Sequence, residues 1–223
     1  MRIILDTADL KTIKELYEVF PISGITTNPS IVSKEKRNPF EVLKEIREFI
    51  GDDDLHVEVL GRTAEEIEKE AEAITKELGK ETFIKIPVTT EGLKAIRNLH
   101  QKGYKTTATA VLTLSQAYLA AMNGADFVAP YVNRIDNFGA SGTETAIDID
   151  DAFRMSDYET KVIAASFKNV KQVEEMIKAD VYSVTLPPDL LRAMLHHPGT
   201  DEAVAKFEKD FSTLDYGMLM LAK

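Results

Sequence analysis

Short apolar runs typical of buried strands alternate along the sequence with longer segments that carry one apolar stripe. The stripes have helical spacing, as in Leu10, Ile13, Leu16 and Phe20. Strand and helix alternate in this way eight times, and no connection is rich in proline, glycine or serine, which predicts one parallel sheet. The strand-like runs are IILD, GITT, LHVEVL, TFIKIPV, KTTATAV, DFVAPYV, KVIAASF and VYSVTLP.

Eight units of strand and helix are the number that closes a (β/α)8 barrel. We therefore predict an α/β fold in one domain over residues 1–223, a (β/α)8 TIM barrel with an extra C-terminal helix. A doubly wound open sheet is the alternative, but its glycine-rich fingerprint should follow the first strand, where this protein has DTADL. Residues 200–223 exceed the eight units, and their end, YGMLMLA, is apolar enough to need a partner surface.

Charge and composition narrow the classes of partner. With 27 Lys and Arg against 37 Asp and Glu, the formal net charge is −10, which disfavours binding to nucleic acid or to an anionic membrane. No apolar run approaches membrane-spanning length, and the N-terminal run meets Asp6 too early for a signal peptide. The absence of cysteine excludes disulfides and thiolate metal sites and fits a reducing compartment, so we expect a cytoplasmic protein.

One lysine stands in the middle of the apolar run TFIKIPV. An isolated ammonium group loses far more solvation in a dry interior than packing returns, so Lys85 is either paired with an anion or functional. Taken alone, the residue gives even odds for a structural ion pair and for catalysis. Its polar neighbours favour catalysis over a structural ion pair.

Polar residues gather where the predicted strands end, which is where (β/α)8 barrels carry their active sites. Each has a structural explanation when taken singly. Asn28 suits a helix cap, Thr109 an ordinary strand position, and Tyr131 a core position from which its hydroxyl reaches water. Their convergence at one end of the predicted barrel is the stronger indication of an active site. The candidates are Asp6, Thr26, Asn28, Glu58, Lys85, Thr109, Tyr131, Arg134, Ser166 and Lys168.

A buried lysine with no metal site beside it indicates Schiff-base chemistry, in which the neutral amine adds to a substrate carbonyl. Desolvation favours the neutral amine, whereas a carboxylate at Glu58 favours the ammonium ion. A water held by Glu58 and Thr109 would relieve this conflict and shuttle protons, with Asp6 as a second proton acceptor. His56 and Glu58 share a strand face, but the other histidines fall in helical segments, so we expect no metal.

The segment SFKN ends the seventh strand and opens the next helix. Backbone N–H groups there, together with Ser166, Lys168 and Arg134, are suited to hold a phosphate group. Lys168 can also be read as a solvated lysine, although a cation in the first turn of a helix is unfavourable without an anion nearby. We favour a phosphate site.

The motifs LDTAD, GITTNPS, KIPVTTEGL, APYVNRID and AASFKN, taken in order, resemble the transaldolase and fructose-6-phosphate aldolase family over nearly the whole sequence. The resemblance implies a (β/α)8 barrel, a Schiff base at Lys85, no cofactor and a sugar-phosphate substrate. It implies that Asp6 and Asn28 handle hydroxyls and protons, that Glu58 and Thr109 hold the catalytic water, and that Thr26 lines the pocket. It also implies a homo-oligomer, a decamer in this family, with C-terminal helices packed on neighbours.

Two branches of this family differ in the fate of the three-carbon unit. Tyr131 resembles the aldolase branch, which releases dihydroxyacetone, whereas Glu58 resembles the transaldolase branch, which passes it to an aldose phosphate in the pentose phosphate pathway. We favour fructose-6-phosphate aldolase because Tyr131 bears on the step that separates the two. Two further alternatives are a sugar-phosphate-binding barrel without turnover and a Schiff-base aldolase for deoxyribose phosphate or a keto acid, which would lack the TTNPS and APYVNR segments.

Overall fold

Eight parallel strands close into a barrel in sequence order, because β8 pairs with β1. A computed structural model describes residues 1–156 and 158–212 of the protein. The predicted (β/α)8 barrel is therefore confirmed, and the open-sheet alternative is excluded. The strands are β1 (Arg2–Asp6), β2 (Ile22–Thr26), β3 (Asp54–Glu58), β4 (Phe83–Pro87), β5 (Thr106–Val111), β6 (Phe127–Pro130), β7 (Lys161–Ala164) and β8 (Ser183–Leu186).

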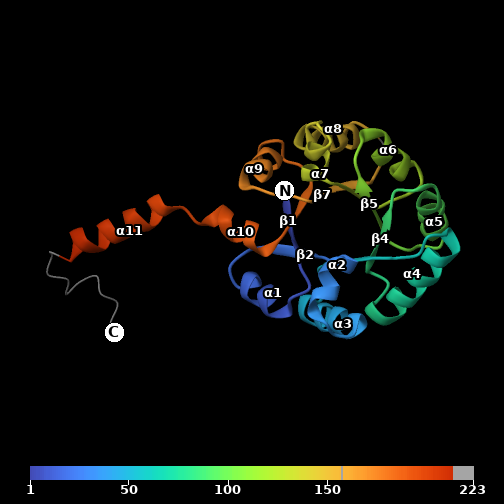
Figure 1. Ribbon diagram of the computed structural model, residues 1–223, viewed down its shortest axis with the longest axis horizontal. Helices are drawn as coiled ribbons and strands as arrows, with labels where there is room; N and C mark the ends of the chain where they lie inside the picture. Colours follow the sequence, from blue (N-terminus) through green and yellow to red (C-terminus); the bar gives the residue numbers. More distant parts are fainter. Residues whose placement is uncertain (157, 213–223) are drawn as a thin grey trace.

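Helices surround the barrel as an outer ring (Figure 1). Polar residues cap the first turn of several helices: the Asn28 Oδ1 atom accepts from the N–H of Ile31, and Thr63 forms a capping box with Glu66. The helices are α1 (Leu10–Tyr17), α2 (Pro29–Val32), the 3₁₀ turn η1 (Ser33–Glu35), α3 (Pro39–Ile50), α4 (Ala64–Leu78), α5 (Thr90–Gln101), α6 (Leu114–Met122), α7 (Val132–Asn137), α8 (Gly142–Arg154), α9 (Val170–Lys178), α10 (Pro188–Leu195) and α11 (Pro198–Phe211).

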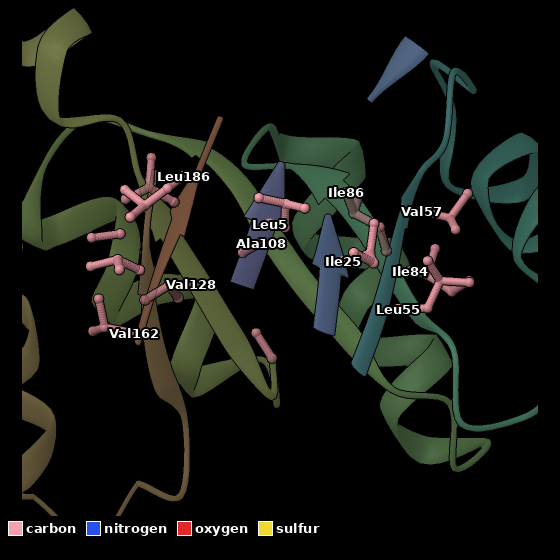
Figure 2. Packing of buried hydrophobic residues seen from close by; sticks show 14 of the residues in the cluster. Leu5, Ile25, Leu55, Val57, Ile84, Ile86, Ala108, Val128, Val162 and Leu186 are labelled. Atoms are coloured by element: carbon pink, nitrogen blue, oxygen red, sulfur yellow. The ribbon is translucent and has the colours of Figure 1, made fainter. Parts of the chain in front are cut away.

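The larger apolar core fills the space between the strands and the helices. Outward-facing side chains of several strands, such as Leu5, Ile25 and Ile86, belong to it (Figure 2). A smaller cluster fills the barrel interior around Ile4, Phe127 and Ile163. Because both faces of each strand are covered, the strands read as nearly continuous apolar runs rather than as alternating ones.

The segment that follows the barrel forms α11, which extends away from the strands (Figure 1). The helix begins at Pro198, close to the predicted start, and has no buried residue among those described. The apolar end YGMLMLA lies outside the described residues, so its packing on a neighbouring subunit stays a prediction. Within residues 1–156 and 158–212, no helix has the length and hydropathy needed to cross a membrane.

Candidate active site

Lys85 lies inside the barrel near the C-terminal ends of the strands. In β4 the side chains of Ile84 and Ile86 belong to the outer core, whereas Phe83 belongs to the interior cluster, and Lys85 shares its strand face. Only 6% of Lys85 is exposed. The lysine therefore interrupts an apolar run because it faces the inside of the barrel, where the neighbouring strands supply polar partners.

Two groups hold the ammonium of Lys85. Its Nζ atom donates to the carbonyl oxygen of Thr27 at 2.7 Å and lies 3.3 Å from the Glu58 Oε2 atom. Glu58 is opposite Lys85 in the β3–β4 register, so adjacent strands bring the two charges together. The carboxylate contacts the ammonium directly, and the water that the sequence predicts between Glu58 and Thr109 stays a prediction. Of these two groups, the Glu58 carboxylate is the one that can take up the lysine proton.

A pocket of about 180 Å³ opens over Lys85 at the C-terminal end of the barrel. Its lining includes eight of the ten side chains singled out in the sequence, namely Asp6, Thr26, Asn28, Lys85, Thr109, Tyr131, Arg134 and Ser166. Glu58 joins them through its contact with Lys85. Lys168 does not line this pocket, and its side chain is exposed.

On one side of the pocket, the Asp6 carboxylate and two threonine hydroxyls form a series of hydrogen bonds. Thr26 Oγ1 donates to Asp6 Oδ1 at 2.7 Å and lies 2.6 Å from Thr185 Oγ1. Burial raises the pKa of Asp6 above its ordinary value, and the Lys85 charge and the Thr26 hydrogen bond offset this only in part. A carboxylate with a raised pKa is a better proton acceptor near neutral pH.

On the opposite side, Tyr131 connects Thr109 with Arg134. The Tyr131 hydroxyl lies 2.8 Å from Thr109 Oγ1, and the Arg134 guanidinium carbon is 4.8 Å from the centre of the Tyr131 ring, within cation–π distance. The β5–β6 register shifts between Ala108 and Val111, and Ala110 has a φ of 57°. This bulge follows Thr109 directly, and bulges of this kind re-aim side chains beside active sites.

The predicted phosphate residues divide between the pocket and its surroundings. Ser166 follows β7 with a φ of 62°, and this left-handed residue turns the backbone as it leaves the strand. After the turn, the backbone N–H of Lys168 donates to Gln172 Oε1 at 2.8 Å, while Asn169 caps α9. Ser166 and Arg134 thus face the pocket together, whereas Lys168 lies beside it on the surface.

Several pocket residues were not among the candidates from the sequence. Thr107, Ala129 and Ile163 each precede a rim residue by two positions, so they lie one layer deeper on the same strand face. Thr185 completes the series of hydroxyl groups from β8. The period-two spacing in KTTATAV and VYSVTLP is the signal in the sequence for Thr107 and Thr185.

A larger hollow, about 910 Å³, lies at the opposite, N-terminal end of the barrel. Residues at the beginnings of strands line it, among them Arg2, Asp54, Phe83 and Lys161, and none of the ten candidates is included. In the described part of the protein, no three or more metal-binding side chains lie together so that they could hold an ion. Size alone therefore does not mark the chemical site in this barrel.

Comparisons with known proteins find sequence relatives over nearly the whole chain. A family profile described as Transaldolase/Fructose-6-phosphate aldolase matches residues 3–218. A "Probable transaldolase" from Clostridium botulinum (strain Eklund 17B / Type B) is 39% identical over 215 residues, which cover 96% of this chain and 100% of the relative. A "Probable fructose-6-phosphate aldolase" from Streptococcus pneumoniae is 38% identical over 213 residues, which cover 95% of this chain and 96% of the relative.

A solved structure matches the fold at low identity. The thiamine phosphate pyrophosphorylase from Pyrococcus furiosus superimposes with a TM-score of 0.58 over 83% of this chain and 85% of its own, at 14% identity. At this level of identity the likeness concerns the barrel architecture alone.

Proposed function

Because the chain belongs to the transaldolase and fructose-6-phosphate aldolase family, we propose that it is a Schiff-base aldolase that cleaves fructose 6-phosphate reversibly to dihydroxyacetone and glyceraldehyde 3-phosphate. The observation that carries the proposal is Lys85, buried in the barrel and in contact with the Glu58 carboxylate at the base of the pocket. A buried amine with an adjacent proton acceptor is the arrangement that nucleophilic addition to a carbonyl needs.

The first stage forms the covalent intermediate. Glu58 takes a proton from the Lys85 ammonium, and the neutral amine adds to the C2 carbonyl of the sugar. The carbinolamine hydroxyl takes the proton back from Glu58 and leaves as water, which gives the iminium ion and restores the carboxylate. A distance of 3.3 Å lets Glu58 serve both transfers after a small displacement.

The second stage breaks the bond between C3 and C4. Asp6 accepts the proton of the C4 hydroxyl, the C3–C4 electron pair moves into the iminium to give an enamine, and glyceraldehyde 3-phosphate leaves. The raised pKa of Asp6 suits this step, because its carboxylate accepts a proton readily near neutral pH. Asp6 then gives up its proton, a proton reaches C3 through the Tyr131 hydroxyl to give the iminium again, and water adds to this iminium to release dihydroxyacetone and return the Lys85 ammonium.

Substrate groups beyond the reacting carbons bind to the rim. Arg134 presents its guanidinium beside Tyr131, and Ser166 lies on the same side of the pocket, so the phosphate binds there, with Lys168 attracting it from the surface. Asn28 and Thr26 bind sugar hydroxyls, and Thr109 orients the Tyr131 hydroxyl. The enzyme needs no cofactor for this chemistry.

A second candidate function is transaldolase. The observation that favours it is the direct contact of a carboxylate, Glu58, with Lys85, together with the name of the Clostridium relative. In this case the enamine adds to an aldose phosphate before protonation, and the enzyme serves the pentose phosphate pathway.

The experiment that separates the two functions follows fructose 6-phosphate with and without erythrose 4-phosphate, with dihydroxyacetone and glyceraldehyde 3-phosphate measured separately. We expect dihydroxyacetone release without the acceptor. Formation of sedoheptulose 7-phosphate only when the acceptor is present would assign the enzyme to the transaldolases. Turnover of neither mixture would overturn both candidate functions.

We further propose that the protein is a homo-oligomer in the cytoplasm, a decamer by family resemblance. The support comes from α11, where Val204 is 50% and Phe207 66% exposed, an unusual position for large apolar side chains on a helix away from the barrel. Replacing Phe207 by Glu should reduce the mass measured by light scattering, whereas replacing the neighbouring Lys206 by Glu should not. A monomeric wild-type protein would contradict the proposal.

A further inference from the structure

The two elements that carry Arg134 and Ser166 are joined at their pocket ends by main-chain hydrogen bonds. Arg134 lies on α7, and Ser166 lies in the turn between β7 and α9. The N–H of Val132 donates to the carbonyl oxygen of Ala165 at 2.9 Å. The N–H of Asn133 donates to the carbonyl oxygen of Ser166, also at 2.9 Å. The start of α7 is therefore fixed against the Ser166 turn.

One glutamine joins the same two elements a second time, outside the pocket. Gln172, in the first turn of α9, is 8% exposed, and its Oε1 atom accepts the backbone N–H of Lys168 at 2.8 Å. Its Nε2 atom donates to Asp136 Oδ2, near the end of α7, at 2.6 Å. One contact needs an acceptor and the other a donor, so the carboxamide has a single orientation. Gln172 thus ties the backbone after Ser166 to the helix that carries Arg134.

Asp136 extends these contacts to a third element. Its Oδ1 atom accepts the N–H of Gly142, the first residue of α8, at 2.7 Å. Each oxygen of the carboxylate therefore has its own N–H donor, and the carboxylate is held in place as firmly as the carboxamide. Neither Asp136 nor Gln172 lines the pocket. Any effect of this pair on a substrate must therefore pass through α7 and the Ser166 turn.

The turn beside this pair has an unfavourable backbone conformation. The φ of Ser166 is 62°, in the left-handed region, and a serine stays there when surrounding contacts hold it. Such contacts lie on both sides of the turn: Asn133 donates to the Ser166 carbonyl oxygen, and Gln172 accepts the N–H of Lys168. Loss of the second contact would let the turn relax and would move the Ser166 hydroxyl relative to Arg134.

We propose that Gln172, held by Asp136, is a positioning residue for the phosphate group of the substrate. It keeps Ser166 and Arg134 in the arrangement in which both can bind one phosphate, because hydrogen bonds to a phosphate depend on the alignment of their donors. This inference rests on the proposed function, in which the phosphate binds at these two side chains. The pair should therefore affect the binding of phosphorylated aldehydes and leave the chemistry at Lys85 unchanged.

The test compares glyceraldehyde 3-phosphate with glyceraldehyde as the acceptor for dihydroxyacetone. The ratio of the two kcat/KM values measures the contribution of the phosphate, and losses common to both reactions cancel in it. In Gln172→Leu we expect this ratio to fall about tenfold, through a higher KM for glyceraldehyde 3-phosphate, as for one lost hydrogen bond. Turnover of glyceraldehyde should stay close to the wild-type value, which also shows that the variant is folded.

Gln116 provides the matched control, because α6 begins with the same local pattern as α9. The Gln116 Oε1 atom accepts the N–H of Leu112, four residues earlier, at 2.8 Å, and Thr113 caps the helix. The two glutamines differ in one contact: Gln172 also donates to Asp136, whereas within the described residues Gln116 Nε2 has no acceptor. Gln116→Leu should leave the ratio as in the wild type.

Exchanging the two side chains separates position from charge. In the double variant Asp136→Asn with Gln172→Glu, the new amide can accept from Gly142 and donate to the new carboxylate, which can still accept from Lys168. All three hydrogen bonds and the net charge are kept, so the ratio should return towards the wild-type value. Each single variant breaks the pairing. Asp136→Asn should therefore lower the ratio although it removes a negative charge near the phosphate, whereas a purely electrostatic role would raise the ratio.

The outcomes separate failure of this inference from failure of the proposed function. A wild-type ratio in Gln172→Leu, or an equal loss in Gln116→Leu, would overturn the positioning role while the aldolase function stands. A higher ratio in Asp136→Asn, or no recovery in the double variant, would overturn the part of Asp136. A wild-type protein that turns over neither acceptor and gives no borohydride-trapped adduct would overturn the proposed function, and this inference with it.

Discussion

The two ends of the barrel both contain charged residues, but they hold them differently. At the N-terminal end, Lys105 pairs with Glu81 and has 39% of its side chain exposed, and the hollow around it is the larger one. At the C-terminal end, Lys85 pairs with Glu58 and has 7% of its side chain exposed, in a pocket about a fifth of that volume. Burial in a narrow pocket removes water from around an amine and so changes its reactivity. An amine beside a wide, solvent-accessible hollow stays hydrated.

The largest effect should separate the two lysines. Replacing Lys85 by Met should lower turnover by about 10³-fold or more, because the covalent nucleophile is lost. Replacing Lys105 by Met removes an exposed ion pair of about 0–1 kcal/mol and should leave turnover unchanged. Since Lys85→Met leaves the Glu58 carboxylate without its cation, the double variant with Glu58→Gln controls for stability. Comparable turnover in Lys85→Met and wild type would refute the difference between the ends.

The next effect concerns the reaction branch. Replacing Tyr131 by Phe should lower the release of free dihydroxyacetone about 10²-fold, as for the loss of a proton donor, and should lower transfer to erythrose 4-phosphate less. At the other end, Tyr182→Phe removes a hydroxyl near the larger hollow and should change neither rate. Equal losses of release and transfer in Tyr131→Phe would show that the hydroxyl has no part in release.

The third effect is on stability: a substitution towards the N-terminal end should destabilise the protein and leave the chemistry at Lys85 intact. Phe127 packs inside the barrel against Phe83 and His56, between the hollow and the pocket. Replacing it by Ala should lower the free energy of unfolding by about 3–5 kcal/mol, measured by urea denaturation. Below the new melting temperature, Lys85 should still form its adduct with dihydroxyacetone. Loss of the adduct in the folded variant would mean that the N-terminal end takes part in the chemistry.

The smallest effect is on the pH dependence of stability. Burial raises the pKa of both Asp6, in the pocket, and Asp126, in the hollow. The stability that each contributes is therefore complete below the ordinary pKa of 3.8 and is lost as the pH rises through the raised value. Relative to the wild type, Asp6→Asn and Asp126→Asn should both gain stability as the pH rises from 4 to 7. Only Asp6→Asn should lose turnover, and a gain towards low pH would contradict the sign.

The barrel was predictable because each strand has its own apolar run, and the outer core at positions such as Ile84 and Ile86 follows from period-two alternation. The inward direction of Lys85 follows from the same alternation once the strand is assigned. Because active sites of (β/α)8 barrels lie at the carboxyl ends of the strands, Asp6, Tyr131 and Ser166 could be predicted to lie at the same end of the barrel.

Other features depend on strand register and on backbone turns, which cannot be read from the spacing of residues in the sequence. The contact of Glu58 with Lys85 depends on the register of β3 and β4, and the bulge at Ala110 depends on that of β5 and β6. The pair of His56 and Thr107 joins strands on either side of β4, across the barrel interior. Lys168 lies outside the pocket because the backbone turns at Ser166, in a conformation that serine rarely adopts.

The most direct test of Schiff-base chemistry at Lys85 is to locate the covalent bond. The full-length protein is incubated with dihydroxyacetone and sodium borohydride, and the modified peptide is identified by mass spectrometry. We expect one reduced three-carbon adduct per protein molecule, on Lys85, and none in Lys85→Met. An adduct on Lys105 or Lys161 at the other end of the barrel, or no adduct while fructose 6-phosphate is still cleaved, would contradict this assignment.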